Sequence, residues 1–284
     1  IVVGALPFSA TGDTTGYGAD HNYTAGQCPG ESSYGLAAPD LVYAFTPAVD
    51  GDYMIQLTGN GFDSNLYVFS DCADPGASCL GADEDICSNC TESLELALTA
   101  GTTYFIVVDG YSNSSYTNDG PYTLTVDRVG DTCTAPFTIP VVPFTVDGDT
   151  TGYGADYGYS AGSCPPETGA WGAGAPDQVY ALTPTYTNDY TITLTGAGFD
   201  SNLYVVSDCG DVNANCIAGD EDACSSCTES VNVALTAGQT YYVIVDGYSN
   251  SSYTNDGPYT LTVDCVPDTC AELGYECGDW DDGC

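Results

Sequence analysis

Basic side chains are almost absent from this 284-residue sequence, which has no lysine, one arginine (Arg128) and one histidine (His21). The sequence also contains 40 aspartates and glutamates, which gives a formal net charge of −39. A nucleic-acid surface needs Lys and Arg to displace counterions, a P-loop needs its lysine, and a membrane-surface helix needs a basic face, so all three are excluded. Acid–base catalysis by histidine would have to use His21 alone.

Long apolar runs are absent as well, since none reaches the roughly 20 residues of a membrane-spanning helix. No signal-peptide pattern accompanies the opening residues Ile1-Val2-Val3, so we interpret the chain as a processed or trimmed secreted one. Apolar residues make up 43% of the chain and aromatic residues 12%, which is enough for a buried core and unlike an acidic disordered segment. The 15 cysteines favour an oxidising, extracellular location.

The sequence contains two copies of one long unit. Val108–Asp127 recurs letter for letter as Val245–Asp264. A repeat of this length is typical of a whole domain and not of a solenoid unit. Asp131-Thr132-Cys133, at the head of the second unit, returns as Asp268-Thr269-Cys270 and opens a third unit that stops early. The expected domains are residues 1–130, residues 131–266 and a Cys-rich tail at residues 267–284.

Short segments rich in β-branched and aromatic residues fill each unit, and Gly, Pro, Asn and Asp separate them. In the first unit they are Leu41–Thr46, Asp52–Thr58, Asn65–Ser70, Ser93–Leu98, Thr102–Val108 and Tyr122–Val126. Ile1–Phe8 is expected to form a further strand, at a terminus where chains can exchange strands. The predicted fold class is all-β: two tandem antiparallel β-sandwiches of jelly-roll type, followed by a disulfide-rich C-terminal tail.

Several stretches of each unit resemble one known family. In the first unit they are Gly61–Val68 (GFDSNLYV), Gly81–Asp85 (GADED), Ser93–Tyr111 and Gly120–Val126 (GPYTLTV). They resemble the bacterial pre-peptidase C-terminal domain, over roughly residues 38–127 and 175–264. The resemblance implies a non-catalytic, secreted β-sandwich that is often stabilised by calcium. The tail at Cys270–Cys284 is similar to a Cys-rich repeat of secreted bacterial proteins.

Acidic residues cluster at two places in each unit, where the family motif has acidic residues too. Calcium binds several oxygens from carboxylates, amides and carbonyls, and four clustered carboxylates without a cation would repel one another. We therefore expect calcium at these places; the alternative is an acidic, solvated loop. The expected ligands are Asp63, Asn65, Asp83, Glu84 and Asp85 in the first unit and Asp200, Asn202, Asp220, Glu221 and Asp222 in the second. The Asp-Gly stretch at Asp109 is interpreted as a turn.

Four cysteines recur at equivalent places in both units: Cys72, Cys79, Cys87 and Cys90, repeated as Cys209, Cys216, Cys224 and Cys227. The CxxC pairs would suit zinc or redox chemistry, but they lie in acidic loops and not at a helix N-terminus, so local disulfides are predicted. The predicted bonds are Cys72–Cys79, Cys87–Cys90, Cys209–Cys216 and Cys224–Cys227, with Cys133–Cys164 at the head of the second unit.

Cys28 lacks the partner that its equivalent Cys164 has, because the first-unit counterpart of Cys133 would precede Ile1. Cys270 is the head cysteine of the interrupted third unit. One hypothesis is a bridge from Cys270 of one chain to Cys28 of the next, which would build a head-to-tail polymer. The alternative is a trimmed chain. The cysteines Cys265, Cys270, Cys277 and Cys284 allow three pairings among themselves.

The remaining motifs are less specific. Asp13–Gly16 and its repeat Asp149–Gly152 resemble the paired Asp-Thr-Gly of aspartic proteases, but the spacing and the Gly-rich flanks do not suit a proton-sharing dyad. Tyr111 and Tyr248 lie in Asn- and Ser-rich loops, where they could contact sugars or pack locally. Sequons for N-glycosylation occur at Asn22, Asn89, Asn113 and Asn250.

Together these features predict a secreted, non-enzymatic structural protein that is disulfide-stapled and calcium-stabilised. It is expected to bind itself head to tail, in an extracellular filament or surface layer. The alternative is an accessory or adhesion module of a larger secreted protein, with a polysaccharide or a matrix protein as its partner. Neither function involves nucleic acid or membrane insertion.

Overall fold

The structure is a computed structural model of the chain, and it divides into two compact units, Ile1–Val129 and Gly130–Cys284. It describes residues 1–21, 23, 26–29, 37–85, 87–113, 115, 117–222, 226–249 and 254–267. The expected tail at residues 267–284 therefore lies outside the described residues, except for its first residue. None of the helices described reaches the length and apolarity that a membrane crossing requires.

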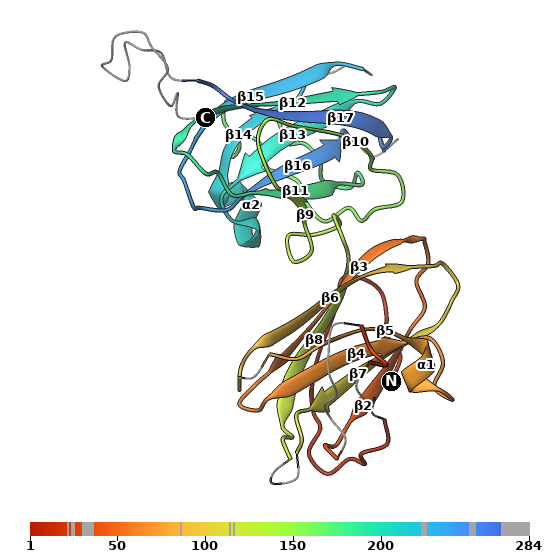
Figure 1. The fold of residues 1–284 in the computed structure, drawn as a ribbon. Helices are drawn as coiled ribbons and strands as arrows, with labels where there is room; N and C mark the ends of the chain where they lie inside the picture. The colour runs from red at the N-terminus through yellow and green to blue at the C-terminus, as the bar shows by residue number, and fades with distance from the viewer. Residues whose placement is uncertain are drawn as a thin grey trace. The chain divides into compact units, whose positions relative to one another are not determined.

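The first unit is a sandwich of two four-stranded sheets (Figure 1). One sheet has the order β1 (Phe8–Asp13), β8 (Pro121–Arg128), β3 (Gly51–Gly59) and β6 (Thr91–Leu98). The other has the order β2 (Leu41–Phe45), β7 (Tyr104–Gly110), β4 (Ser64–Phe69) and β5 (Cys79–Asp83). All pairs within these sheets are antiparallel, and the four-residue helix α1 (Pro75–Ser78) precedes β5.

The second unit repeats this plan (Figure 1). One sheet has the order β10 (Phe144–Asp149), β17 (Pro258–Cys265), β12 (Asn188–Gly196) and β15 (Thr228–Leu235). The other has the order β14 (Cys216–Asp220), β13 (Ser201–Val206), β16 (Tyr241–Gly247), β11 (Gln178–Leu182) and β9 (Phe137–Ile139). The short helices η1 (Cys209–Asp211) and α2 (Val212–Asn215) precede β14, and β9 pairs in parallel with β11.

The core of each sandwich follows from the period-two alternation of its strands. In β3 the side chains of Tyr53, Ile55 and Leu57 are buried, while the residues between them are partly exposed. A buried hydrogen bond joins the two sheets in each unit, from Tyr43 to Tyr122 and from Tyr180 to Tyr259, with 2.7 Å between the hydroxyl oxygens in both cases. The prediction of an all-β fold built from antiparallel sandwiches is confirmed.

Candidate functional site

The structure brings two of the expected calcium ligands together in the first unit. Asp63 lies immediately before β4 and Glu84 lies immediately after β5, and β4 and β5 are neighbours in one sheet. Oδ1 of Asp63 accepts a hydrogen bond from the backbone N–H of Cys87, at 3.1 Å. Burial raises the pKa of Asp63, and Glu84 is only 6% exposed. A proton or a cation between two buried carboxyls at the ends of neighbouring strands would relieve their repulsion.

The equivalent pair in the second unit is Asp200 and Glu221. Burial, followed by the charge of Asp200, raises the pKa of Glu221 to about 7. Oε1 of Glu221 is buried and accepts no hydrogen bond from the residues that the structure describes. A buried carboxylate oxygen without a donor is costly unless a proton or a cation satisfies it. Both units therefore present a carboxylate pair at the same place.

Four of the other expected ligands, Asn65, Asn202, Asp83 and Asp220, accept hydrogen bonds with their side-chain oxygens. The amide oxygens of Asn65 and Asn202 accept hydrogen bonds from the buried hydroxyls of Tyr23 and Tyr159. Asp83 and Asp220 each accept a backbone N–H of the next strand at 2.6 Å, from Ser93 and Ser230. The backbone N–H groups of Asp85 and Asp222 donate to the side chains of Glu92 and Glu229.

The donor atoms fit a hard cation only in part. Within the described ranges, no group of three or more His, Cys, Asp or Glu side chains is arranged to hold a metal ion. The carboxylate pairs Asp63–Glu84 and Asp200–Glu221 are oxygen donors of the type that calcium prefers, and backbone carbonyls or water would have to complete the shell. The pairs, and not the full sets expected from the sequence, are the candidate ligands.

A second group of buried acidic residues was not expected from the sequence. Asp109, interpreted above as part of a turn, is instead the second-last residue of strand β7 and is fully buried. Its Oδ2 accepts a hydrogen bond from Tyr67 at 3.5 Å, and in the second unit Tyr204 donates to Asp246 at 3.0 Å. Burial raises the pKa of both aspartates well above the ordinary value. The turn prediction was wrong because the strand continues to Gly110 before the chain reverses.

The charge of Asp177, in the second unit, raises the pKa of Asp246 after the larger effect of burial. Oδ2 of Asp177 accepts the backbone N–H groups of Asp156 and Tyr157, while Oδ1 is buried and has no hydrogen-bond partner among the described residues. Burial, and then the charges of Asp156 and Asp131, raise the pKa of Asp177 to about 7. The exact repetition of the VDGY stretch was the one sign in the sequence that Asp109 and Asp246 have a shared structural role.

The cysteine pairing differs from the prediction. Cys28 bonds Cys79, and the equivalent Cys164 bonds Cys216, so the predicted bonds Cys72–Cys79, Cys209–Cys216 and Cys133–Cys164 do not form. The reason is that Cys79 opens strand β5, which lies beside the segment 26–29: the backbone N–H of Ala82 donates to the carbonyl of Pro29. Cys28 is therefore bonded within its own chain and is not available for the bridge to Cys270.

Cys133 bonds Cys209, and Cys87–Cys90 is present as predicted. Cys72, the counterpart of Cys209, is exposed and free. Cys227 and Cys265 are disulfide-bonded. Cys224, Cys270, Cys277 and Cys284 lie outside the described residues.

Two of the four sequons can be placed. Asn89 and Asn113 are exposed, and Asn89 has a backbone φ of 118°. Asn22 and Asn250 lie outside the described residues. Tyr248 packs against Trp171, with 5.5 Å between the ring centroids. The aromatic residue at the equivalent place in the first unit, Tyr34, lies outside the described residues.

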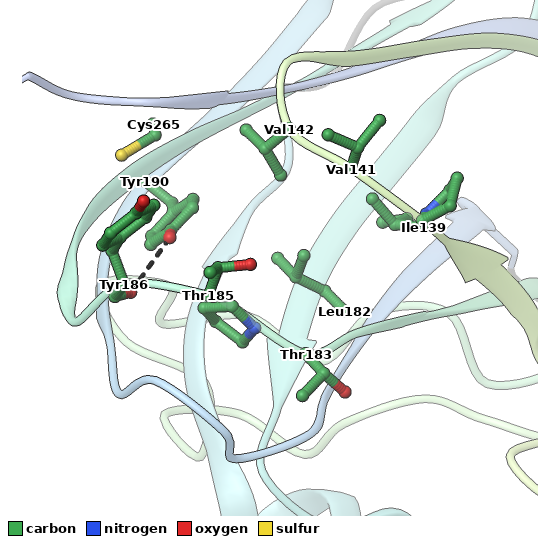
Figure 2. Close-up of a pocket in the computed structure, with 11 residues that line it drawn as sticks. Ile139, Val141, Val142, Leu182, Thr183, Thr185, Tyr186, Tyr190 and Cys265 are labelled. Carbon is green, nitrogen blue, oxygen red and sulfur yellow. Dashed lines mark hydrogen bonds between the residues drawn. The ribbon is translucent and has the colours of Figure 1, made fainter. Parts of the chain in front are cut away.

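A pocket of about 130 Å³ opens in the second unit (Figure 2). The segment Ile139–Val142 forms one side of it, and Leu182–Tyr186, Tyr190 and Cys265 form the rest. The hydroxyl of Tyr190 donates a hydrogen bond to the carbonyl of Tyr186 at 3.0 Å, and this bond joins two of the residues that line the pocket. The residues that the structure describes around this pocket include two tyrosines but no carboxylate and no histidine.

No protein-family model matches this chain, and no curated protein matches it. The pre-peptidase C-terminal domain of a collagenase from Bacillus anthracis matches at 18% identity and a TM-score of 0.28, over 45% of this chain and 91% of that domain. A xanthan lyase from Paenibacillus matches at 12% identity and a TM-score of 0.26, over 91% of this chain and 25% of that enzyme. The CUB1-EGF-CUB2 region of human MASP-1/3 matches at 9% identity and a TM-score of 0.22, over 90% of this chain and 99% of that region. At TM-scores this low, the matches assign no function.

Proposed function

We propose that this chain is an extracellular, non-catalytic structural protein whose sandwich units join end to end. The observation that carries the proposal is the repetition of a whole folded domain. Strands β1–β8 of the first unit have equivalents in β10–β17 of the second, which adds β9, and both units have the same Tyr–Tyr hydrogen bond between sheets and the same Tyr–Asp hydrogen bond. A fold that already repeats within one chain can be extended by adding copies.

Two further features support an exterior location. Disulfides persist in oxidising environments, and each unit carries at least two of them among the described residues. The sequence has one arginine and no lysine, so trypsin-type proteases have a single cleavage site in 284 residues. Both features suit material that is exposed outside the cell.

Calcium is part of the proposal. The residues that would hold it are Asp63 with Glu84 in the first unit and Asp200 with Glu221 in the second. When bound, the ion would neutralise each pair and tie the start of one strand to the end of its neighbour. The chain has almost no cationic side chains of its own for this task.

Thermal unfolding in calcium and in EGTA tests the metal. Calcium should raise the melting temperature, because a ligand present at 100 times its Kd adds about 2.7 kcal/mol of stability. Glu221→Gln should reduce this gain, while Glu95→Gln, on the surface of β6, should leave it unchanged. An unchanged melting temperature in EGTA would rule calcium out.

Sedimentation velocity and negative-stain microscopy of the 284-residue chain, under native and non-reducing conditions, test the assembly. The proposal expects linear oligomers whose length grows with protein concentration. A single monomeric species at all concentrations contradicts it.

A binding module is the second candidate function. It is favoured by the half-buried ring pair of Trp171 and Tyr248 in the second unit, since aromatic rings of this kind can stack on a ligand. Monomers that bind a glycan array, and lose that binding in Trp171→Ala, would support this function over the structural one.

A further inference from the structure

A fully buried glutamate lies next to the candidate calcium pair in each unit. Glu92 is the second residue of β6, Glu229 is the second residue of β15, and both are 0% exposed. They belong to a stretch, Cys-Thr-Glu-Ser, that occurs at 90–93 and again at 227–230. A carboxyl buried this deeply is costly unless hydrogen bonds satisfy it, so its hydrogen-bond partners indicate its role.

In the second unit, the two carboxyl oxygens of Glu229 bond two different segments of the chain. The hydroxyl of Ser201 donates to Oε1 at 3.4 Å, and the backbone N–H of Asp222 donates to Oε2 at 2.9 Å. Ser201 directly follows Asp200, and Asp222 directly follows Glu221. Glu229 therefore holds the residue next to each member of the carboxylate pair.

The first unit has the same arrangement. The hydroxyl of Ser64 donates to Oε1 of Glu92 at 3.1 Å, and the backbone N–H of Asp85 donates to Oε2 at 2.8 Å. Ser64 directly follows Asp63, and Asp85 directly follows Glu84. Because both copies keep the two bonds, the bridge belongs to the fold and not to one unit.

The bridge also joins the two sheets of the sandwich. Glu229 lies in β15, whereas Ser201 opens β13 in the other sheet. The backbone N–H of Ser230, the neighbour of Glu229, donates to Oδ2 of Asp220 at 2.6 Å, and Asp220 ends β14. The start of β15 therefore holds the start of β13 and the end of β14 at the same time.

These bonds suit Glu229 to orienting calcium ligands and not to binding the ion. Both of its oxygens already accept hydrogen bonds, and its side chain is fully buried. Glu221 differs, because its buried Oε1 accepts no hydrogen bond from the residues that the structure describes. Calcium binds oxygens at about 2.3–2.6 Å, so the distance between its ligands must be held closely.

We propose that Glu229 and Glu92 are positioning residues for calcium, because each bridges the strand start and the loop that carry the two carboxylates of its unit. The inference rests on the calcium sites of the proposed function and names the residues that keep the two ligands of each site at a fixed separation. Loss of such an outer partner typically lowers metal affinity by about 10–100-fold.

Calcium titration by isothermal calorimetry tests the second-unit bridge. The background variant is Glu84→Gln, which removes a ligand of the first-unit site. In this background, Glu229→Leu should raise the calcium Kd by about 10–100-fold. Glu229→Gln should keep the Kd within a few-fold, because its amide oxygen can accept the N–H of Asp222 while its nitrogen donates to the hydroxyl of Ser201.

Two further variants separate positioning from general destabilisation. Ser201→Ala removes one bond of the bridge and should raise the calcium Kd several-fold. Tyr204→Phe removes a buried hydrogen bond to Asp246 in the same unit, so it should lower stability in EGTA but leave the Kd unchanged. Urea unfolding in EGTA, measured for every variant, gives the loss of stability with which each Kd is compared.

The outcomes distinguish the bridge from the calcium site itself. If the background chain binds calcium and a folded Glu229→Leu binds it as tightly, the positioning role is wrong and the calcium site stands. Equal losses of affinity in Glu229→Gln and Glu229→Leu, or in Tyr204→Phe and Ser201→Ala, also overturn the positioning role. If Glu229→Leu does not fold, the comparison of Ser201→Ala with Tyr204→Phe decides. A parent chain that binds no calcium overturns both the site and the bridge.

Discussion

At the scale of single residues, this protein buries carboxyl groups that most folds would leave in water. Asp109, Asp246 and Asp177 are almost fully buried, and the one arginine lies elsewhere, on β8. Tyrosine hydroxyls and backbone N–H groups are the donors instead. These donors favour the charged carboxylate and lower its pKa, but burial raises the pKa by more, so the folded state favours the protonated acid.

The first residue-scale prediction concerns Asp177, whose pKa of about 7 in the folded chain exceeds the ordinary 3.8. The folded state holds the proton to a higher pH than the unfolded chain. The stability from this group is therefore full below about pH 4 and is lost as the pH rises through 7. Asp177→Asn should gain stability relative to the parent chain between pH 5 and pH 8, measured by urea unfolding in chelator.

The groups around Asp177 do not reverse the expected loss of stability with rising pH. The charges of Asp156 and Asp131 raise the pKa of Asp177 further. The pKa of Asp246 is itself raised well above the ordinary value, and Tyr204 is neutral in this range. Parallel stability curves for Asp177→Asn and the parent chain across pH 5–8 would show that the group is not buried as described.

The second residue-scale prediction concerns the hydroxyl of Tyr204. Its hydrogen bond to Asp246, at 3.0 Å, lies in a fully buried site. Tyr204→Phe leaves the aspartate without that donor and should cost about 1–3 kcal/mol in the free energy of unfolding. Tyr186→Phe, at an exposed ring, is the matched control and should change it little. Equal effects in both variants would contradict the buried hydrogen bond.

At the scale of elements, strands in which apolar and polar residues alternate clearly were predictable from the sequence. Strands with little such alternation were not. The expected segments Asp52–Thr58 and Ser93–Leu98 coincide closely with β3 and β6. Strand β5 (Cys79–Asp83) was missed because its sequence, CLGAD, contains a glycine and too few apolar residues to alternate. It exists because it pairs with β4 at the sheet edge.

The expected strand over Ile1–Phe8 is also shorter in the structure. Val2 makes an isolated parallel bridge to Ala44, and regular pairing begins only at Phe8, in β1. Gly4 and Pro7 interrupt the segment, because glycine lacks a packing side chain and proline lacks the N–H that a ladder needs.

The element-scale prediction concerns the disulfide bond that holds strand β5. The Cys28–Cys79 bond ties this weak edge strand to a segment 51 residues earlier. Cys28→Ser combined with Cys79→Ser should cost about 2–5 kcal/mol, the usual loss for a native disulfide in a small domain. Cys72→Ser, at an exposed free thiol only seven residues before Cys79, is the control and should cost almost nothing. Denaturant unfolding measures both, and a large loss in the control would show that Cys72 is not free.

At the scale of the whole molecule, the net charge of −39 sets the response to salt. Like charges on a compact chain repel one another, and dissolved salt screens them over a Debye length of about 30 Å at 0.01 M and about 8 Å at 0.15 M. The melting temperature should therefore rise when NaCl is increased from 0.01 M to 0.15 M, in EGTA. A melting temperature that falls or stays constant would mean that the carboxylates are already neutralised.

The sequence alone determined the fold class and the repeat, because both depend on information that is local or periodic. Alternation predicts strands, and identity between the two copies predicts the same domain twice. The sequence also determined that the protein has almost no cationic side chains, because folding cannot add lysines that the chain does not contain.

Only the tertiary structure decided which cysteines bond and which acids are buried. Cys72 and Cys79 are close in sequence, yet Cys79 faces Cys28, because strand pairing brings the segment 26–29 to β5. Asp109 resembles a turn residue in the sequence, yet strand β7 carries it into the interior. Both outcomes depend on contacts between residues far apart in the chain, and these form only when the two sheets pack together.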